Sequence, residues 1–136
     1  MRKQQIVCML QNMWGGGGYV PSLFFKLYPK NPTAQRCYKS FADYDVYFTE
    51  TTPVIGLTPD SCPPIDEEFV ELVVNNLSNF DAIVAVGSQA KRALSTYNLN
   101  IPIVYMRHPN ARGWSYAKDG NIAADELKYK LENNIL

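Results

Sequence analysis

Short apolar runs alternate along the chain with longer segments in which apolar residues recur at helical spacing. The runs at 5–10, 81–87 and 101–106 are nearly continuous, which is typical of strands covered on both faces in a parallel sheet. Residues 45–49 are rich in β-formers, and Pro53, which cannot donate to a ladder, follows them. The sequence therefore predicts four short strands.

The spacing of apolar residues predicts helices between these strands. The clearest one begins at 66–68, where acidic side chains suit the positive end of a helix dipole. Another begins with Ser88 as its N-cap, and an amphipathic helix covers 121–132. Weaker patterns predict two short helices, at 22–28 and 33–41.

Strands that alternate with helices predict an α/β fold, here a three-layer α/β/α arrangement around a four-stranded parallel sheet. The chain has 136 residues, the length of one domain, and we expect a single domain over 1–136. Ligands of such folds bind at the carboxyl ends of the strands. Three segments are expected to meet at that edge: 12–18, 50–53 and 107–114.

Charge balance and cysteine usage narrow the classes of function. The 13 Lys and Arg residues equal the 13 Asp and Glu residues, so the chain lacks a large basic excess, although a local basic face for nucleic acid stays open. No apolar run reaches the roughly 20 residues of a bilayer span and no export signal develops, so we expect a cytoplasmic protein without a membrane partner. Cys8, Cys37 and Cys62 include no CxxC pair, so we expect core thiols and no metal site.

A glycine-rich segment, 15–18, follows the first predicted strand. A GxGxxG motif would need glycine at Val20 and no GK[ST] follows, so neither phosphate-binding motif is present. The segment is then either a flexible surface loop or a wall where the backbone approaches a ligand closely. Its place at the end of a strand favours the wall.

Residues 107–114 combine two arginines, the only histidine and a tryptophan. In a protein of zero net charge, this loop concentrates cationic and aromatic groups. A nucleic-acid chain is one ligand that fits, with Arg107 and Arg112 on phosphates and Trp114 stacked on a base. The competing interpretation is a solvated turn that carries a surface histidine.

Three segments together resemble the uracil-DNA glycosylase superfamily: 11–15 (QNMWG), 84–90 (VAVGSQA) and 103–110 (IVYMRHPN). Their order and spacing are similar to those of the superfamily over most of the chain. The first motif of that superfamily supplies an amide or carboxylate that positions water, and the resemblance puts Asn12 in this role, as in mismatch-specific uracil and thymine glycosylases. The last motif, H-P-S, supplies a histidine to the leaving base, and His108 matches it.

The resemblance implies that a base is flipped out of DNA and its N-glycosidic bond hydrolysed without a cofactor. Asn12 would direct water at the anomeric carbon, and His108 would donate a hydrogen bond to the departing base. An aromatic ring, Phe24 or Phe25, would stack on the flipped base. Residues expected at the base are Gln11, Trp14, Phe24, Phe25 and Glu50; those expected at DNA are Ser88, Arg107, Asn110, Arg112 and Trp114, with Arg112 filling the gap in the duplex.

Two positions depart from the superfamily. Glu50 stands near its base-reading asparagine, and because an ionised carboxylate only accepts hydrogen bonds, it would repel uracil O4 and favour a base with an exocyclic amine. The competing interpretation of Glu50 is an exposed charge at a strand end. The pair Met13-Trp14 replaces the superfamily's Pro-Tyr or Pro-Gly, which leaves the geometry of this loop open.

Three functions therefore stay open. The first is a monomeric DNA glycosylase acting on a damaged, mismatched or modified base, cytoplasmic, or nucleoid-associated if bacterial. The second is a catalytically silent nucleic-acid or base-binding module of the same fold. The third is a small nucleoside or nucleotide hydrolase, for which zero net charge is more natural because no long phosphate backbone is bound.

Overall fold

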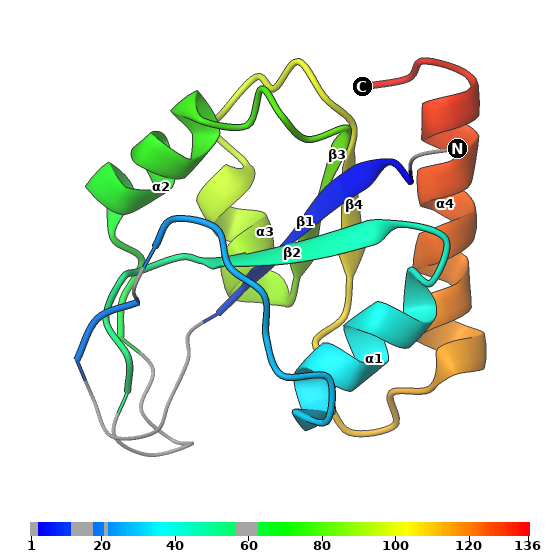
Figure 1. Cartoon of the computed structure of the whole chain (residues 1–136), viewed down its shortest axis with the longest axis horizontal. Helices are drawn as coiled ribbons and strands as arrows, with labels where there is room; N and C mark the ends of the chain where they lie inside the picture. The colour runs from blue at the N-terminus through cyan, green and yellow to red at the C-terminus, as the bar shows by residue number, and fades with distance from the viewer. Residues whose placement is uncertain (1–2, 12–17, 21, 57–62) are drawn as a thin grey trace.

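A parallel four-stranded sheet lies between two helical layers, as the sequence predicts (Figure 1). The strands are β1 (Gln5–Leu10), β2 (Asp45–Glu50), β3 (Ala82–Val86) and β4 (Ile103–Met106), in the order β2-β1-β3-β4. The computed structural model describes residues 3–11, 18–20, 22–56 and 63–136, and the structural statements below concern these residues.

Four α-helices and one π-helical turn complete the described fold. They are α1 (Pro32–Ser40), α2 (Glu67–Asn75), α3 (Ser88–Leu94), α4 (Asn121–Glu132) and the π-helical turn η1 (Tyr116–Gly120). The observed α4 has the predicted bounds, and α2 begins after Asp66, whose carboxylate accepts a hydrogen bond from the Phe69 amide at 3.0 Å. None of the helices in the described ranges is long and apolar enough to span a bilayer.

The alternating side chains of β1 separate two cores. Ile6 and Cys8 point toward the layer of α1 and α4, whereas Val7 and Met9 point toward the layer of α2 and α3. All four side chains are fully buried, because β1 has a parallel neighbour on each side and a helical layer on each face. The predicted core thiols at Cys8 and Cys37 are confirmed, while Cys62 lies outside the described residues.

The helix predicted at 22–28 is wrong. The described part of this segment is extended and follows the outer edge of β2, where Phe25 and Phe48 exchange backbone hydrogen bonds of 3.0 and 2.8 Å. A second antiparallel bridge pairs Tyr19 with Val54, beyond the end of β2. Pairing with an exposed strand edge satisfies the backbone groups there, and it outweighs the weak local helical preference.

The N-cap predicted at Ser88 is also wrong by one residue. Gly87 occupies the N-cap of α3 with a φ of 91°, and no side chain accepts a capping hydrogen bond there. Glycine adopts this left-handed backbone at little cost, so the chain can turn sharply from β3 into α3. This turn also brings Gly87 against the loop that follows β4, as described below.

Gly120 is required by the close packing of η1 on α1. A Cβ atom at Gly120 would lie 2.3 Å from Ser40 Oγ and 3.2 Å from Ser40 Cβ. The Ser40 hydroxyl is buried and has no hydrogen-bond partner among the described residues. The contact between η1 and α1 therefore leaves no space for a side chain at this position.

We expect Gly120→Ala to lower the free energy of unfolding by about 1–3 kcal/mol, because overpacking forces the two elements apart. Adding Ser40→Ala should recover part of this loss, since it removes Oγ but keeps the Cβ contact. Urea unfolding of the two single variants and the double variant measures this coupling. Additive losses would show that the two side chains do not compete for one space.

Candidate functional site

The carboxyl ends of the four strands lie at one edge of the sheet and carry a cluster of buried polar side chains. Thr51, just after β2, donates from Oγ1 to the carbonyl of Gln11, just after β1, at 2.7 Å. Gln89 of α3 donates from Nε2 to Thr51 Oγ1 at 2.8 Å and to the carbonyl of Pro63 at 3.3 Å. These bonds connect the ends of β1 and β2 with the beginning of α3.

Glu50 is the last residue of β2 and has no exposed surface. Neither carboxyl oxygen has a hydrogen-bond partner among the described residues. Burial raises the pKa of the Glu50 carboxyl well above its usual range, which favours the neutral acid. The interpretation of Glu50 as an exposed charge is therefore wrong, and the premise that it is ionised does not fit its surroundings.

His108 follows β4 and packs against the turn at Gly87. A Cβ atom at Gly87 would lie 3.3 Å from His108 Cβ and 3.5 Å from Cδ2, so the lack of a side chain at Gly87 leaves space for the imidazole. The backbone N–H of Asn110 donates to His108 Nδ1 at 3.1 Å. Burial lowers the pKa of the imidazole, so the ring is neutral near pH 7, with its proton on Nε2. His108 thus offers a neutral hydrogen-bond donor.

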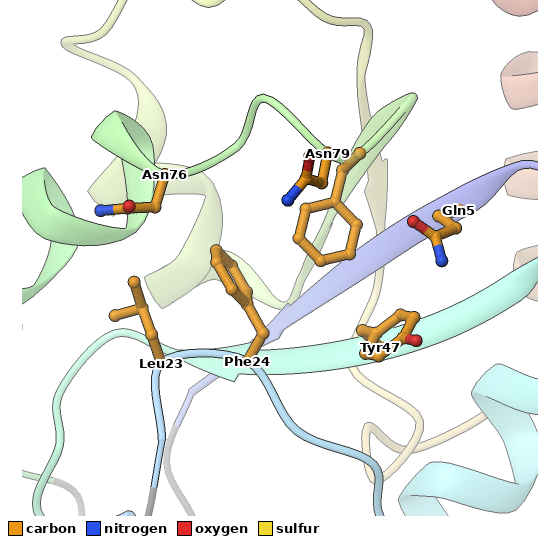
Figure 2. A pocket seen from close by; sticks show the side chains of 7 residues that line it. Gln5, Leu23, Phe24, Tyr47, Asn76 and Asn79 are labelled. Carbon is orange, nitrogen blue, oxygen red and sulfur yellow. The ribbon is translucent and has the colours of Figure 1, made fainter.

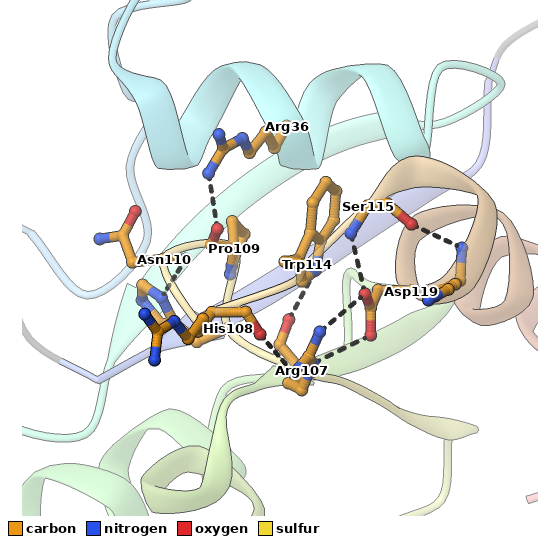
Figure 3. Close-up of polar contacts among 10 residues, drawn as sticks. Arg36, Arg107, His108, Pro109, Asn110, Trp114, Ser115 and Asp119 are labelled. Atoms are coloured by element: carbon orange, nitrogen blue, oxygen red, sulfur yellow. Dashed lines mark hydrogen bonds and ion pairs between the residues drawn. The ribbon is translucent and has the colours of Figure 1, made fainter.

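The loop after β4 is held by its own polar side chains (Figure 3). Arg107 forms two hydrogen bonds with the Asp119 carboxylate, Nε to Oδ1 at 3.1 Å and Nη2 to Oδ2 at 3.2 Å. Its Nη1 donates to the Arg112 carbonyl at 3.0 Å, and the Trp114 indole donates to the Arg107 carbonyl at 3.0 Å. Arg107 and Trp114 therefore have structural roles inside the loop, and the contacts with DNA predicted for them stay predictions.

Arg36, on α1, holds this loop from outside and was not predicted. Its Nη1 donates to the carbonyl of Pro109, the residue after His108, at 2.5 Å, and its guanidinium lies 5.6 Å from the centre of the Trp114 ring (Figure 3). The two bonded residues are separated by 73 positions, so no local sequence pattern signals the contact. Arg36 thereby ties the backbone at His108 to the helical layer.

Three of the predicted DNA-binding residues are exposed. Ser88 lies at the start of α3, and Asn110 and Arg112 lie in the loop after His108. The Arg112 side chain forms no hydrogen bond or ion pair with the other described residues, whereas its backbone carbonyl accepts from Arg107. These side chains remain available to a ligand that approaches His108 from solvent.

The two predicted stacking rings lie in different places. Phe25 is opposite Phe48, and because alternate residues of a strand share a face, it lies on the face of β2 that also carries Glu50. Phe24 instead packs on Phe80, with ring centres 4.7 Å apart, in a pocket beside the amino end of β1. Of the two rings, the placement favours Phe25 as a neighbour of the candidate site.

Part of the predicted site lies outside the described residues. Asn12 and Trp14 belong to this part, whereas Gln11 is described and its carbonyl accepts from Thr51. Within the described ranges, no cluster of three or more His, Cys, Asp or Glu side chains is arranged to hold a metal ion. Sequence reasoning also missed Thr51 and Gln89, although polar residues that directly follow buried strands are a signal for such an edge.

Comparison with protein-family models, with curated proteins and with solved structures gives no match to this chain. Assignment of a function therefore depends on the geometry and chemistry of the site.

The buried acid makes stability depend on pH in a defined direction. Because the pKa of Glu50 is raised in the folded state, the unfolded chain loses this proton first as pH rises. The carboxyl should thus lower the free energy of unfolding by about 1.4 kcal/mol per pH unit between its unfolded and folded pKa values. Glu50→Gln removes the titration, so the variant should become increasingly more stable than the wild type as pH rises through this interval.

Chemical unfolding of both proteins at several pH values measures the difference. At pH values below the usual range of a glutamic acid, where both states are protonated, the two stabilities should be similar. A difference that does not change with pH would mean that Glu50 titrates normally in the folded protein.

Proposed function

We propose that the protein is a DNA glycosylase-like hydrolase that releases a base flipped out of DNA at the edge of the sheet that carries Glu50 and His108. The observation that carries this proposal is the placement of a buried carboxyl and a largely buried imidazole at the same edge of the sheet, where burial favours the uncharged form of each. Glu50 ends one outer strand and His108 follows the other. These two strands are three strand spacings apart, which is about 14 Å. Gln11 and Gly87, at the ends of the central strands, lie between them.

Cleavage of an N-glycosidic bond leaves positive charge on the sugar and negative charge on the base. A neutral His108 with its proton on Nε2 supports this step, because it donates a hydrogen bond to the base oxygen as negative charge develops there. The backbone N–H of Asn110 donates to Nδ1 and thereby keeps the imidazole proton on Nε2. The resemblance assigns the positioning of water to Asn12.

The neutral form of Glu50 favours a different class of base from the one predicted from the sequence. An ionised Glu50 would favour a base with an exocyclic amine. A neutral carboxylic acid has one donor and one acceptor, as an amide has. It therefore matches a base edge that carries a carbonyl oxygen beside an N–H, as uracil and thymine do, and does not repel it. Neither Glu50 oxygen has a partner among the described residues, which is costly for a buried acid, and a bound base would satisfy both of them. Because Glu50 has no exposed surface, base entry requires movement of the segments that cover it.

The distribution of charge supports DNA as the partner. Helix α1 contacts the segment 107–119, since Arg36 bonds Pro109 and the Lys39 ammonium lies 4.4 Å from the centre of the Tyr116 ring. These two segments carry five basic residues and one acidic residue, which Arg107 neutralises. Four acidic residues lie just before or within α2, in the other helical layer. Zero net charge therefore conceals a basic face beside His108, which suits phosphates. The basic residues are Arg36, Lys39, Arg107, Arg112 and Lys118.

A base-release assay with duplexes that contain uracil, thymine or amino-bearing bases opposite guanine tests the function. We expect release of uracil or thymine, and a loss of about 10²–10³-fold in His108→Ala, the usual effect of removing one hydrogen-bond donor to a developing anion. Glu50→Gln should keep most of the release, because an amide has the same donor and acceptor as the neutral acid. Glu50→Ala should lose it.

Circular dichroism and thermal unfolding of each variant control for folding. Wild-type protein that binds these duplexes and releases no base from any of them would favour the silent binding module, which the complete burial of Glu50 also suits. Preferential release of amino-bearing bases would contradict the neutral acid at Glu50.

A charge reversal tests the basic face. Arg112→Glu should weaken binding to a DNA duplex and lower the slope of log affinity against log salt by about one, the effect of one lost phosphate contact. Lys128→Glu is the matched control, because Lys128 is exposed and lies away from the loop after β4. It is near the C-terminal end of α4, where Lys130, two residues later, donates to the carbonyl of Ile103 at the start of β4. Equal losses in the two variants would show that binding depends on net charge and not on this face.

A further inference from the structure

A pocket lies away from the strand ends, where the layer of α2 and α3 leaves the amino end of β1 uncovered (Figure 2). Its volume is about 650 Å³, within the range of about 300–1,000 Å³ that is usual for small-molecule sites. Gln5 begins β1, so the pocket is separated from the candidate site by the length of this strand, about 17 Å. The seven lining residues are Gln5, Leu23, Phe24, Tyr47, Asn76, Asn79 and Phe80.

Three aromatic rings form a continuous apolar wall of this pocket. The ring of Phe80 lies 4.7 Å from that of Phe24 and 5.5 Å from that of Tyr47, between ring centres. Phe80 is buried, whereas Phe24 and Tyr47 are half-buried and have surface to offer. An apolar patch of this kind with a polar rim is typical of a ligand-binding surface.

Three amide side chains form the rim. Asn76 donates from Nδ2 to the carbonyl of Leu72 at 2.8 Å within α2, and Gln5 donates from Nε2 to Asp45 at 3.4 Å. Both residues thus keep a carbonyl oxygen for a ligand. Asn79 is exposed and forms no hydrogen bond with the other described side chains or backbone, so it offers a donor and an acceptor.

Among the described residues, no charged side chain lines the pocket. Beside it, Asp81 Oδ2 accepts a hydrogen bond from the Gln5 backbone amide at 2.8 Å, which places a negative charge near the rim. Lys26 is paired with Asp45, Nζ to Oδ1 at 2.5 Å, and lies 4.0 Å from the centre of the Tyr47 ring. Lys26 thereby holds Tyr47 from one side. An ionised ligand such as a phosphate would find no opposite charge here to replace its water.

We propose that this pocket binds an uncharged, flat heterocycle with hydrogen-bonding groups along its edge, namely a nucleobase or nucleoside. The aromatic wall matches the apolar faces of such a ring, and the amides of the rim match the donors and acceptors at its edge. The proposal is independent of the function proposed for the strand ends at Glu50 and His108, because the two sites share no residue.

Titration of the ¹⁵N-labelled full chain with uridine and with adenosine, followed by NMR, tests this site. We expect at least one nucleoside to bind with a Kd below about 1 mM and to shift the side-chain amide signals of Gln5, Asn76 and Asn79. Uridine monophosphate should bind no more tightly than uridine. Phe24→Leu, which removes the ring but keeps an apolar side chain, should weaken binding about tenfold.

Two further variants keep the test decisive. Asn79→Ala changes an exposed side chain without structural contacts, so it should fold and should weaken binding even if Phe24→Leu unfolds. His108→Ala should leave these shifts unchanged, which separates this pocket from the strand-end site. Shifts confined to Gly87 and His108, equally tight binding of glucose, or no shift at about 5 mM of either nucleoside would overturn the proposal.

Discussion

The parallel pairing of four strands in the order β2-β1-β3-β4 is the constraint on which the rest of the structure depends. Because all strands run in one direction, the residues that follow them meet at one edge, although they are far apart in sequence. The two central strands place Gln11 and Gly87 at the middle of this edge, and the outer strands place Glu50 and His108 on either side. Both cores serve this arrangement by burying β1 from Ile6 to Leu10.

Desolvation gives the two outer groups a shared electrostatic character. Burial disfavours the charged form of each, so it raises the pKa of Glu50 and lowers the pKa of His108. Two groups whose burial favours the uncharged form suit an uncharged base better than a phosphate. The phosphates that accompany such a base would instead meet the basic face formed by α1 and the loop after β4.

Elements with a strong local pattern could be predicted from the sequence, whereas contacts between distant segments could not. The strands and α4 follow from their apolar spacing, and the position of His108 after β4 follows from the strand itself. The extended segment at Phe25 depends on the free edge of β2, and the bond from Arg36 to Pro109 joins residues 73 positions apart. The neutrality of Glu50 depends on burial from all sides, which residue type alone does not reveal.

The protonation states of Glu50 and His108 test the central claim most directly. NMR of selectively labelled protein, with ¹³C at the glutamate carboxyl and ¹⁵N in the imidazole, reports both at neutral pH. We predict a protonated Glu50 carboxyl and a neutral His108 whose proton is on Nε2, with Nδ1 accepting from the Asn110 amide. An ionised Glu50 carboxylate or a doubly protonated His108 at neutral pH would contradict the proposal that two uncharged groups receive the base.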